Sequence, residues 1–235
     1  NPAAEFKQTA LEKSLSSPLN ISIIFCELNL ASSPNKFLKS FALIFNSFGS
    51  ITNLLTISAW IYTTSSPSPE VSQRILTHSS SSSSNQQYAL SIDGNGKLYF
   101  LGDAGAFEQG GMNISNNTIN INQWNHVAIT YDGQAVKLYL DGNLDLTHPV
   151  VDNFNSSVIG HFFIGNRFDG AETFEGEIDN INAWNIALTQ QEIQQYMNCP
   201  PTGNESGLVG CWNFEEGSGN TVFDQTSNGN NGTIN

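Results

Sequence analysis

Basic residues are scarce in this sequence. Only 8 of its 235 residues are Lys or Arg, against 21 Asp or Glu, and the formal net charge is −13. An acidic surface repels phosphate backbones and anionic headgroups, so we expect no binding to nucleic acid or to a membrane surface. The charge is compatible with neutral glycans, cationic partners or divalent cations, and equally with a charge that serves only solubility.

Charged residues of both signs are also rare. They make up 12% of the chain, against roughly 25% in an ordinary globular protein. Asn, Ser, Thr and Gly supply the polarity instead, as is typical of an extracellular β-sandwich whose turns are made by Asn, Asp and Gly. We therefore expect a secreted or cell-surface protein. Because the sequence begins at Asn1 rather than Met, we also expect it to be part of a longer, multidomain chain.

Cysteines and long apolar runs are both few. The three cysteines Cys26, Cys199 and Cys211 have no C-x-x-C spacing, which argues against metal clusters and thioredoxin-like chemistry. Cys199 and Cys211 flank a turn region and are candidates for a disulfide, which loop geometry rather than sequence decides. No apolar run reaches the roughly 18 residues that span a bilayer, so we expect no membrane insertion.

Alternating apolar and polar residues predict strands separated by turns. The hairpin signal is strongest at Asp93-Gly94-Asn95-Gly96, where the central residues tolerate a positive φ. Further Asp-Gly pairs end strands at Asp132 and Asp141. The predicted strands are Leu55–Tyr62, Gln73–Thr77, Tyr88–Ile92, Lys97–Leu101, His126–Tyr131, Val136–Leu140, His161–Ile164 and Gly176–Asn185.

One short helix is predicted near residues 189–197. Thr189 and Glu192 have the spacing of a capping box, and Leu188 and Ile193 occupy the positions of a hydrophobic staple. Pro200-Pro201 ends the element. Strands at intervals of about 8–12 residues with a single helix favour an all-β fold, a two-sheet antiparallel β-sandwich of the jelly-roll type.

Several consecutive phrases resemble laminin-G-like jelly-roll domains of the concanavalin A-like lectin/glucanase superfamily. The phrases are LTISAWIY (55–62), LSIDGNGKLYF (90–100), INQWNHVAITYDGQAVKLYLDGNL (121–144), FIGNR (163–167) and FEGEIDNINAWNIALTQQEIQQY (174–196). Their order and spacing match the family across about residues 51–197. The resemblance implies a jelly roll and a non-catalytic binding module.

The tail from 208 to 235 resembles the opening of a laminin-G-like unit, although here it comes last. Cys211 stands where the family often has an aromatic residue. The tail either begins a truncated next repeat or folds back on the sandwich, and we expect Leu208–Phe214 to pair into the same sandwich. The expected organisation is a poorly defined segment over 1–40, the laminin-G-like domain over 41–200, and the tail over 201–235.

Acidic side chains suggest two different chemistries. Glu175, Glu177 and Asp179 follow each other at period two, the one arrangement in the sequence suited to general acid/base catalysis. The family resemblance instead implies a structural calcium ion, whose oxygen ligands turns rich in Asp and Asn supply. Alternatively, the tail residues only make Asx turns. The candidate calcium ligands are Asp179, Glu177, Asp224, Asn228 and Asn230.

Ligand contacts are expected at loops, where recognition residues concentrate. The four tryptophans lie within strand phrases and are interpreted as core residues. The candidate ligand-binding residues are Phe107, Phe154, Asn166, Arg167, Phe168 and Asp169. We interpret the chain as a non-enzymatic binding or adhesion module for polysaccharide or glycoprotein. A structural spacer repeat without a ligand, and a glycoside hydrolase using Glu175, Glu177 and Asp179, are the alternatives.

Overall fold

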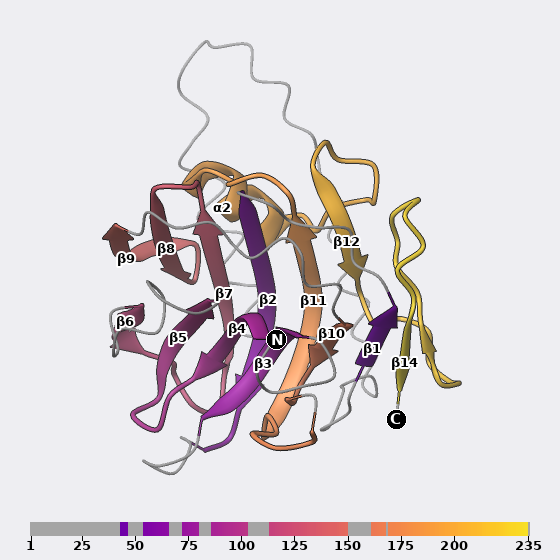
Figure 1. Ribbon diagram of the computed structural model, residues 1–235, viewed down its shortest axis with the longest axis horizontal. Coiled ribbons are helices and arrows are strands. Elements are labelled where there is room, and N and C mark those ends of the chain that lie inside the picture. Colours follow the sequence, from indigo (N-terminus) through magenta and orange to yellow (C-terminus); the bar gives the residue numbers. More distant parts are fainter. Residues whose placement is uncertain are drawn as a thin grey trace, which may run out of the picture. The chain divides into compact units, whose positions relative to one another are not determined.

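Two antiparallel β-sheets account for most of the residues that the structure describes (Figure 1). The structure is a computed structural model that describes residues 43–46, 54–65, 72–79, 86–102, 113–149, 161–167 and 169–234. These residues all belong to one compact unit, Ser32–Asn235. Over these residues, the prediction of an all-β, two-sheet jelly roll with one short helix is confirmed.

The larger sheet has eight strands. In spatial order they are β13 (Thr221–Val222), β14 (Gly232–Ile234), β1 (Leu43–Asn46), β10 (His161–Ile164), β3 (Gln73–Ser79), β4 (Gln86–Ile92), β5 (Lys97–Gly102) and β6 (Ile114–Thr118).

The smaller sheet has six strands. In spatial order they are β12 (Leu208–Trp212), β11 (Gly176–Trp184), β2 (Leu55–Thr63), β7 (Trp124–Tyr131), β8 (Ala135–Leu140) and β9 (Asn143–Pro149). Every strand range predicted from the sequence overlaps an observed strand. Five strands lie outside the predicted ranges, because each is short or mostly exposed: β1, β6, β9, β13 and β14.

The core lies between the two sheets. Ile57 and Val127 from the smaller sheet join Leu90, Phe100 and Phe162 from the larger one in a single apolar cluster, and all five are fully buried. Removing this apolar area from water is the main driving force for the sandwich.

Helix α2 (Gln190–Asn198) follows β11 and packs on the outer side of the smaller sheet. Thr189 and Glu192 form the predicted capping box. Leu188 and Ile193 are buried in a second apolar cluster with Tyr139 of β8. The predicted helix is therefore confirmed with its cap. No helix in the described ranges is long and apolar enough to cross a membrane.

The tail contributes strands to both sheets. β12 pairs with β11 in the smaller sheet, and β14 pairs with β1 in the larger one, so that the yellow tail lies beside the indigo first strand in Figure 1. The predicted pairing of the tail into the sandwich is confirmed over Leu208–Trp212. Trp212 is fully buried in the main core, where its Nε1–H donates to the Asn230 carbonyl at 2.9 Å. The tail therefore supplies part of the core.

Trp212→Ala tests this role of the tail. We expect the substitution to lower the free energy of unfolding by about 3–5 kcal/mol, because it removes a large buried aromatic side chain and leaves a cavity. Phe223→Ala is the matched control, since Phe223 lies in the same tail and is 51% exposed. Urea denaturation measures both, and a Trp212→Ala variant as stable as the control would show that the core does not need the tail.

Candidate functional site

The outer face of the smaller sheet presents aromatic side chains. Along β2, Ala59 and Ile61 point into the core and are almost fully buried, while Trp60 and Tyr62 alternate with them and are half-buried on the other side. Trp124 begins β7 on the same outer face, because it lies directly opposite Tyr62. Residues opposite each other in an antiparallel pair project to the same side of the sheet.

Two acidic side chains of β11 lie on the same outer face as these aromatic residues. β11 is the strand that flanks β2 on the side away from β7. In β11, Glu177 lies opposite Tyr62 and Asp179 lies opposite Trp60. Both are partly exposed, whereas Ile178 between them is buried in the core. We call Trp60, Tyr62, Trp124, Glu177 and Asp179 the aromatic–acid face.

Helix α2 leaves this part of the sheet uncovered. The helix packs farther along the same strands, where the Tyr196 ring lies 4.7 Å from the ring of Trp184, centroid to centroid. Trp184 is buried there, and the helix residue Ile193 belongs to the same cluster. The outer side of the smaller sheet is thus divided between a helix-covered end and the aromatic–acid face.

Aromatic contacts hold the rings in place. The Tyr62 and Trp124 ring centroids are 5.8 Å apart with an interplanar angle of 57°, and the Trp60 ring packs edge-on against His126 at 5.3 Å. Tilted and edge-on pairs of this kind are favourable for aromatic rings. The interpretation of all four tryptophans as core residues is wrong for Trp60 and Trp124, since outward positions of β2 and β7 carry them.

The carboxyl group of Asp179 on this face has a raised pKa. Burial raises the pKa of Asp179 to about 6, the N–H of Asn180 opposes this with a 2.8 Å hydrogen bond, and the negative charge of Glu215 raises the pKa further. His126 gives no compensating charge, because burial lowers its pKa to about 4 and its Nδ1 has no partner among the described residues. A carboxyl that titrates near neutral pH is characteristic of functional sites.

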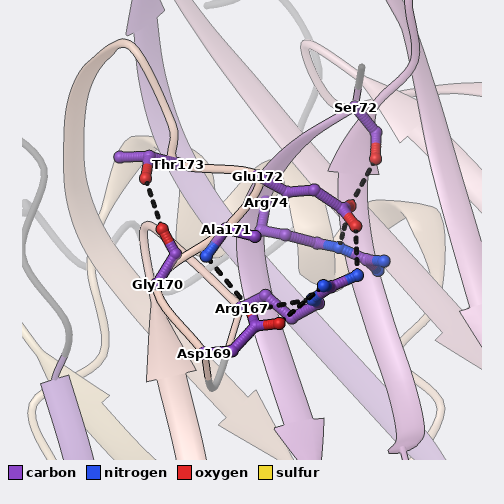
Figure 2. Close-up of polar contacts among 8 residues, drawn as sticks. All are labelled: Ser72, Arg74, Arg167, Asp169, Gly170, Ala171, Glu172 and Thr173. Carbon is purple, nitrogen blue, oxygen red and sulfur yellow. Dashed lines mark hydrogen bonds and ion pairs between the residues drawn. The ribbon is translucent and has the colours of Figure 1, made fainter. Parts of the chain in front are cut away.

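Two of the loop residues predicted to bind ligand, Arg167 and Asp169, are held in a network of ion pairs and hydrogen bonds. We call this network the clamp; its members are Ser72, Arg74, Arg167, Asp169 and Glu172. Arg167 donates two hydrogen bonds to Asp169, at 2.9 and 2.6 Å, and one to Glu172 at 2.8 Å (Figure 2). The other oxygen of Glu172 accepts from Arg74 at 2.7 Å and from Ser72 at 2.5 Å. Two positive and two negative side chains thus balance each other and join β3 to the β10–β11 loop.

These contacts give Arg167 and Asp169 a structural role. The hydrogen bond from Arg167 lowers the pKa of Asp169 to about 2. Asn166 is buried beside the clamp, and its Oδ1 has no hydrogen-bond partner in the described part of the chain. Phe107, Phe154 and Phe168 lie outside the described residues. Ligand binding by this predicted loop cluster stays a prediction.

The tail residues predicted to bind calcium make a tight turn. Both oxygens of Asp224 are used: Oδ1 accepts from the N–H groups of Cys211 and Thr226, and Oδ2 from the Thr226 hydroxyl and the Asn230 N–H. The side chains of Asn228 and Asn230 both donate to the carbonyl of Val209. These bonds fit the alternative interpretation, in which the tail residues make Asx turns.

The residues predicted to bind calcium do not form an acidic cluster within the ranges that the structure describes. Among those residues no group of three or more His, Cys, Asp or Glu side chains is placed to hold a metal ion. Glu177 and Asp179 belong to the aromatic–acid face, while Asp224 is engaged in its turn. The calcium site therefore stays a prediction.

The two described cysteines are not joined by a disulfide. Cys199 is partly exposed and Cys211 is buried, and the candidate disulfide between them is not formed. Burial raises the pKa of Cys211 to about 12, and the charges of Asp224 and Glu205 act in the same direction. Since the thiolate is the reactive form of cysteine, Cys211 is a packing residue rather than a nucleophile.

The pKa of Asp179 predicts a pH-dependent stability. Its ordinary value is 3.8, and its value in the folded protein is about 6. The folded state therefore holds a proton that the unfolded chain releases between these values, so stability falls as the pH rises through this window. We expect Asp179→Asn to stabilise the fold above pH 6 and to have little effect below about pH 4.

Chemical denaturation at a series of pH values measures this effect. Glu215→Gln is the companion variant. Removing the negative charge of Glu215 lowers the pKa of Asp179, so stability should fall over a range that ends at a lower pH. If the free energy of unfolding of Asp179→Asn differs from that of the parent chain by the same amount at every pH, the pKa of Asp179 is not raised in the folded protein.

Comparison with curated proteins gives two partial relatives. Neuronal pentraxin-2 of Cavia porcellus is 32% identical over 88 residues, which cover 33% of this chain and 20% of that protein. A sushi, von Willebrand factor type A, EGF and pentraxin domain-containing protein of Rattus norvegicus is 28% identical over 105 residues, which cover 40% of this chain and 3% of that protein. The chain thus corresponds to a small part of each relative.

Solved structures share the fold at low sequence identity. A protein of Bacteroides ovatus described as carbohydrate-binding has a TM-score of 0.64 at 21% identity, covering 85% of this chain and 57% of its own. A heptameric pentraxin of Limulus polyphemus gives 0.58 at 18%, covering 85% and 92%. The CBM40 domain of a Ruminococcus gnavus sialidase, bound to sialyllactose, gives 0.55 at 19%, covering 68% and 95%.

A family model matches the part of the chain that contains the aromatic–acid face. The model described as the concanavalin A-like lectin/glucanases superfamily, of laminin-G type, matches residues 42–194, well over half of the chain. The match includes β2, β7 and β11, which carry the face. The chain belongs to the concanavalin A-like lectin/glucanases superfamily.

Proposed function

We propose that this chain is a non-catalytic binding module of a secreted or cell-surface protein, and that it holds carbohydrate, free or on a glycoprotein, on the aromatic–acid face. The observation that carries the proposal is the set of three aromatic rings on the outer side of the smaller sheet. Trp60, Tyr62 and Trp124 lie on neighbouring strands, and their rings remain partly exposed.

Aromatic rings in this position suit sugar rings. Each ring offers a large apolar surface, and the apolar C–H face of a pyranose covers such a surface while its hydroxyl groups point outward. Glu177 and Asp179 border the rings, and ionised carboxylates are strong acceptors for hydroxyl donors. The face thus combines the stacking surface and the hydrogen-bond acceptors that a glycan needs.

The structural neighbours support a glycan as the ligand class. The Bacteroides protein is described as carbohydrate-binding, and the Ruminococcus domain was solved with sialyllactose. Domain 4 of an extracellular arabinanase from Geobacillus stearothermophilus, with a TM-score of 0.52 at 17% identity and coverage of 68% of this chain and 74% of that one, was solved with arabinotriose.

The charge of the face limits the kind of glycan. Glu177, Asp179 and the nearby Glu215 are acidic, and the whole chain carries a net charge of −13. Sialylated or sulfated glycans are repelled by such a surface. Neutral glycans, and amino sugars whose ammonium group also interacts with aromatic faces, are the ligands we propose.

A second candidate function is glycoside hydrolysis. Glu177 and Asp179 occupy successive outward positions of one strand, and Asp179 has the raised pKa, about 6, that a general acid needs. Glu175 precedes the strand, where its Oε2 accepts from Ser65 at 3.3 Å. Binding without cleavage remains the preferred proposal, because the neighbours solved with sialyllactose and arabinotriose share this fold.

Loss of aromatic surface tests the binding function. We expect Trp60→Ala and Tyr62→Ala each to weaken binding by about tenfold or more, since aromatic residues at the centre of a binding surface contribute above 1 kcal/mol. Affinity gel electrophoresis with arabinan, β-glucan, galactan and chitosan measures this. Tyr62→Phe is the matched control, because it keeps the ring and removes only the hydroxyl.

A chain that binds none of these polysaccharides, with or without calcium, would instead be a structural spacer. Equal binding by the parent chain and both alanine variants would place the binding site elsewhere. Thermal melting of each variant separates a loss of binding from a loss of folding.

Hydrolysis is tested on the same polysaccharides. We expect no release of reducing ends by the parent chain, because the face serves binding. Hydrolysis that disappears in Glu177→Gln and Asp179→Asn, while polysaccharide binding is retained, would establish the hydrolase in place of the binding module.

A further inference from the structure

A separate polar hollow lies at the open side of the sandwich. β6 is the last strand of the larger sheet and β9 the last strand of the smaller sheet, and the hollow lies beside these two edges. Its volume is about 270 Å³. The residues that line it, which we call the edge hollow, are Asn117, Thr118, Asn120, Asn125, Leu140, Asp141, Asn143, Leu144 and Asp145.

Hydrogen bonds between the two sheets fix one wall of the edge hollow. The carboxylate of Asp145 in β9 accepts from the N–H groups of Asn116 and Asn117 in β6, at 2.5 and 3.2 Å, and from the Asn117 side chain at 2.6 Å. The Asn116 side chain donates to the Asp145 carbonyl. This carboxylate is therefore occupied by N–H donors, which leaves it poorly suited to a cation.

A second wall is fixed from β7. Asn125 is almost completely buried, and its side chain exchanges two hydrogen bonds with the backbone of Asn120, at 2.8 and 3.0 Å. Asp141 accepts from the N–H of His126 at 2.8 Å through one oxygen. These bonds hold the backbone around the edge hollow before any ligand binds, which lowers the entropy cost of binding.

Other polar groups of the edge hollow have no partner in the described part of the chain. These are the hydroxyl of Thr118, the side-chain amide of Asn120, the Oδ1 of Asn143 and the second oxygen of Asp141. Together they include both donors and acceptors. The neighbouring Leu144 is 47% exposed and adds an apolar surface.

We propose that the edge hollow is a second ligand site, which binds a single neutral pyranose ring. Sugar hydroxyls both donate and accept, and so match the mixture of hydroxyl, amide and carboxylate groups, while the C–H face of the ring covers Leu144. The volume lies just below the roughly 300–1,000 Å³ of sites for drug-sized ligands, which limits the occupant to one ring. This site does not depend on the aromatic–acid face.

Proton–nitrogen NMR titration tests the edge hollow with the methyl glycosides of glucose, galactose, mannose and N-acetylglucosamine. We expect at least one of them to shift the backbone amides of residues 117–120 and 141–145. Asn120→Ala and Asn143→Ala each remove hydrogen-bonding groups, and we expect each to weaken that binding by about threefold to tenfold.

Two control variants distinguish this site from the proposed function. Asn220→Ala removes an exposed amide far along the chain and should leave the titration unchanged. Trp60→Ala should also leave it unchanged, even where it abolishes polysaccharide binding. The proposal is overturned if no glycoside shifts these amides, if the shifts persist in both hollow variants, or if calcium chloride shifts them and no sugar does.

Discussion

The pairing of β2 with β7 determines both the core and the aromatic–acid face. Across this pair Ile61 faces Asn125 and Ala59 faces Val127 toward the interior, while Tyr62 lies opposite Trp124 on the outside. Because side chains alternate along a strand, a slip of one residue would expose the aliphatic residues and bury the aromatic ones. The large apolar area buried by one set of residues therefore fixes which side of the sheet carries the other set, and the ring contacts then orient the aromatic side chains there.

Helix α2 covers only one end of the outer side of the smaller sheet, and the partly exposed aromatic rings lie at the other end. Beyond Trp60, the outer side of β2 continues with Thr56, whose hydroxyl donates to the Ile186 carbonyl and accepts from the Leu188 N–H. These bonds fix the segment that leads into the helix, and Ile193 then covers the sheet. The two ends carry similar residue types, yet one is packed under the helix and the other is open. The Trp60, Tyr62 and Trp124 side chains are half-buried, so each keeps part of its ring accessible at this end of the sheet.

Residue patterns predicted the sheets and the helix well, because alternation and capping are local. They predicted the β4–β5 hairpin, but the positive φ falls at Gly96 rather than at the two central residues. They failed for Trp60 and Trp124, since a strand pattern shows that residues alternate and does not show which side is covered. They also missed that Glu172 links Arg167 to Arg74, because Arg74 lies 98 residues away from Glu172 in the sequence. Functional surfaces arise from such pairings between distant segments, which a single sequence leaves open.

The tail adds strands to both sheets of the sandwich and so stabilises the sheet that carries the aromatic–acid face. β12 extends the smaller sheet next to β11, the strand that carries Glu177 and Asp179. Asp224 fixes this arrangement, because its carboxylate accepts from the β12 backbone at Cys211 and from the turn that leads to β14. Glu215 follows β12 directly and raises the pKa of Asp179. The acidity of the aromatic–acid face is therefore set partly by the tail, so the same closing segment that completes the core also adjusts the charge of the proposed glycan-binding surface.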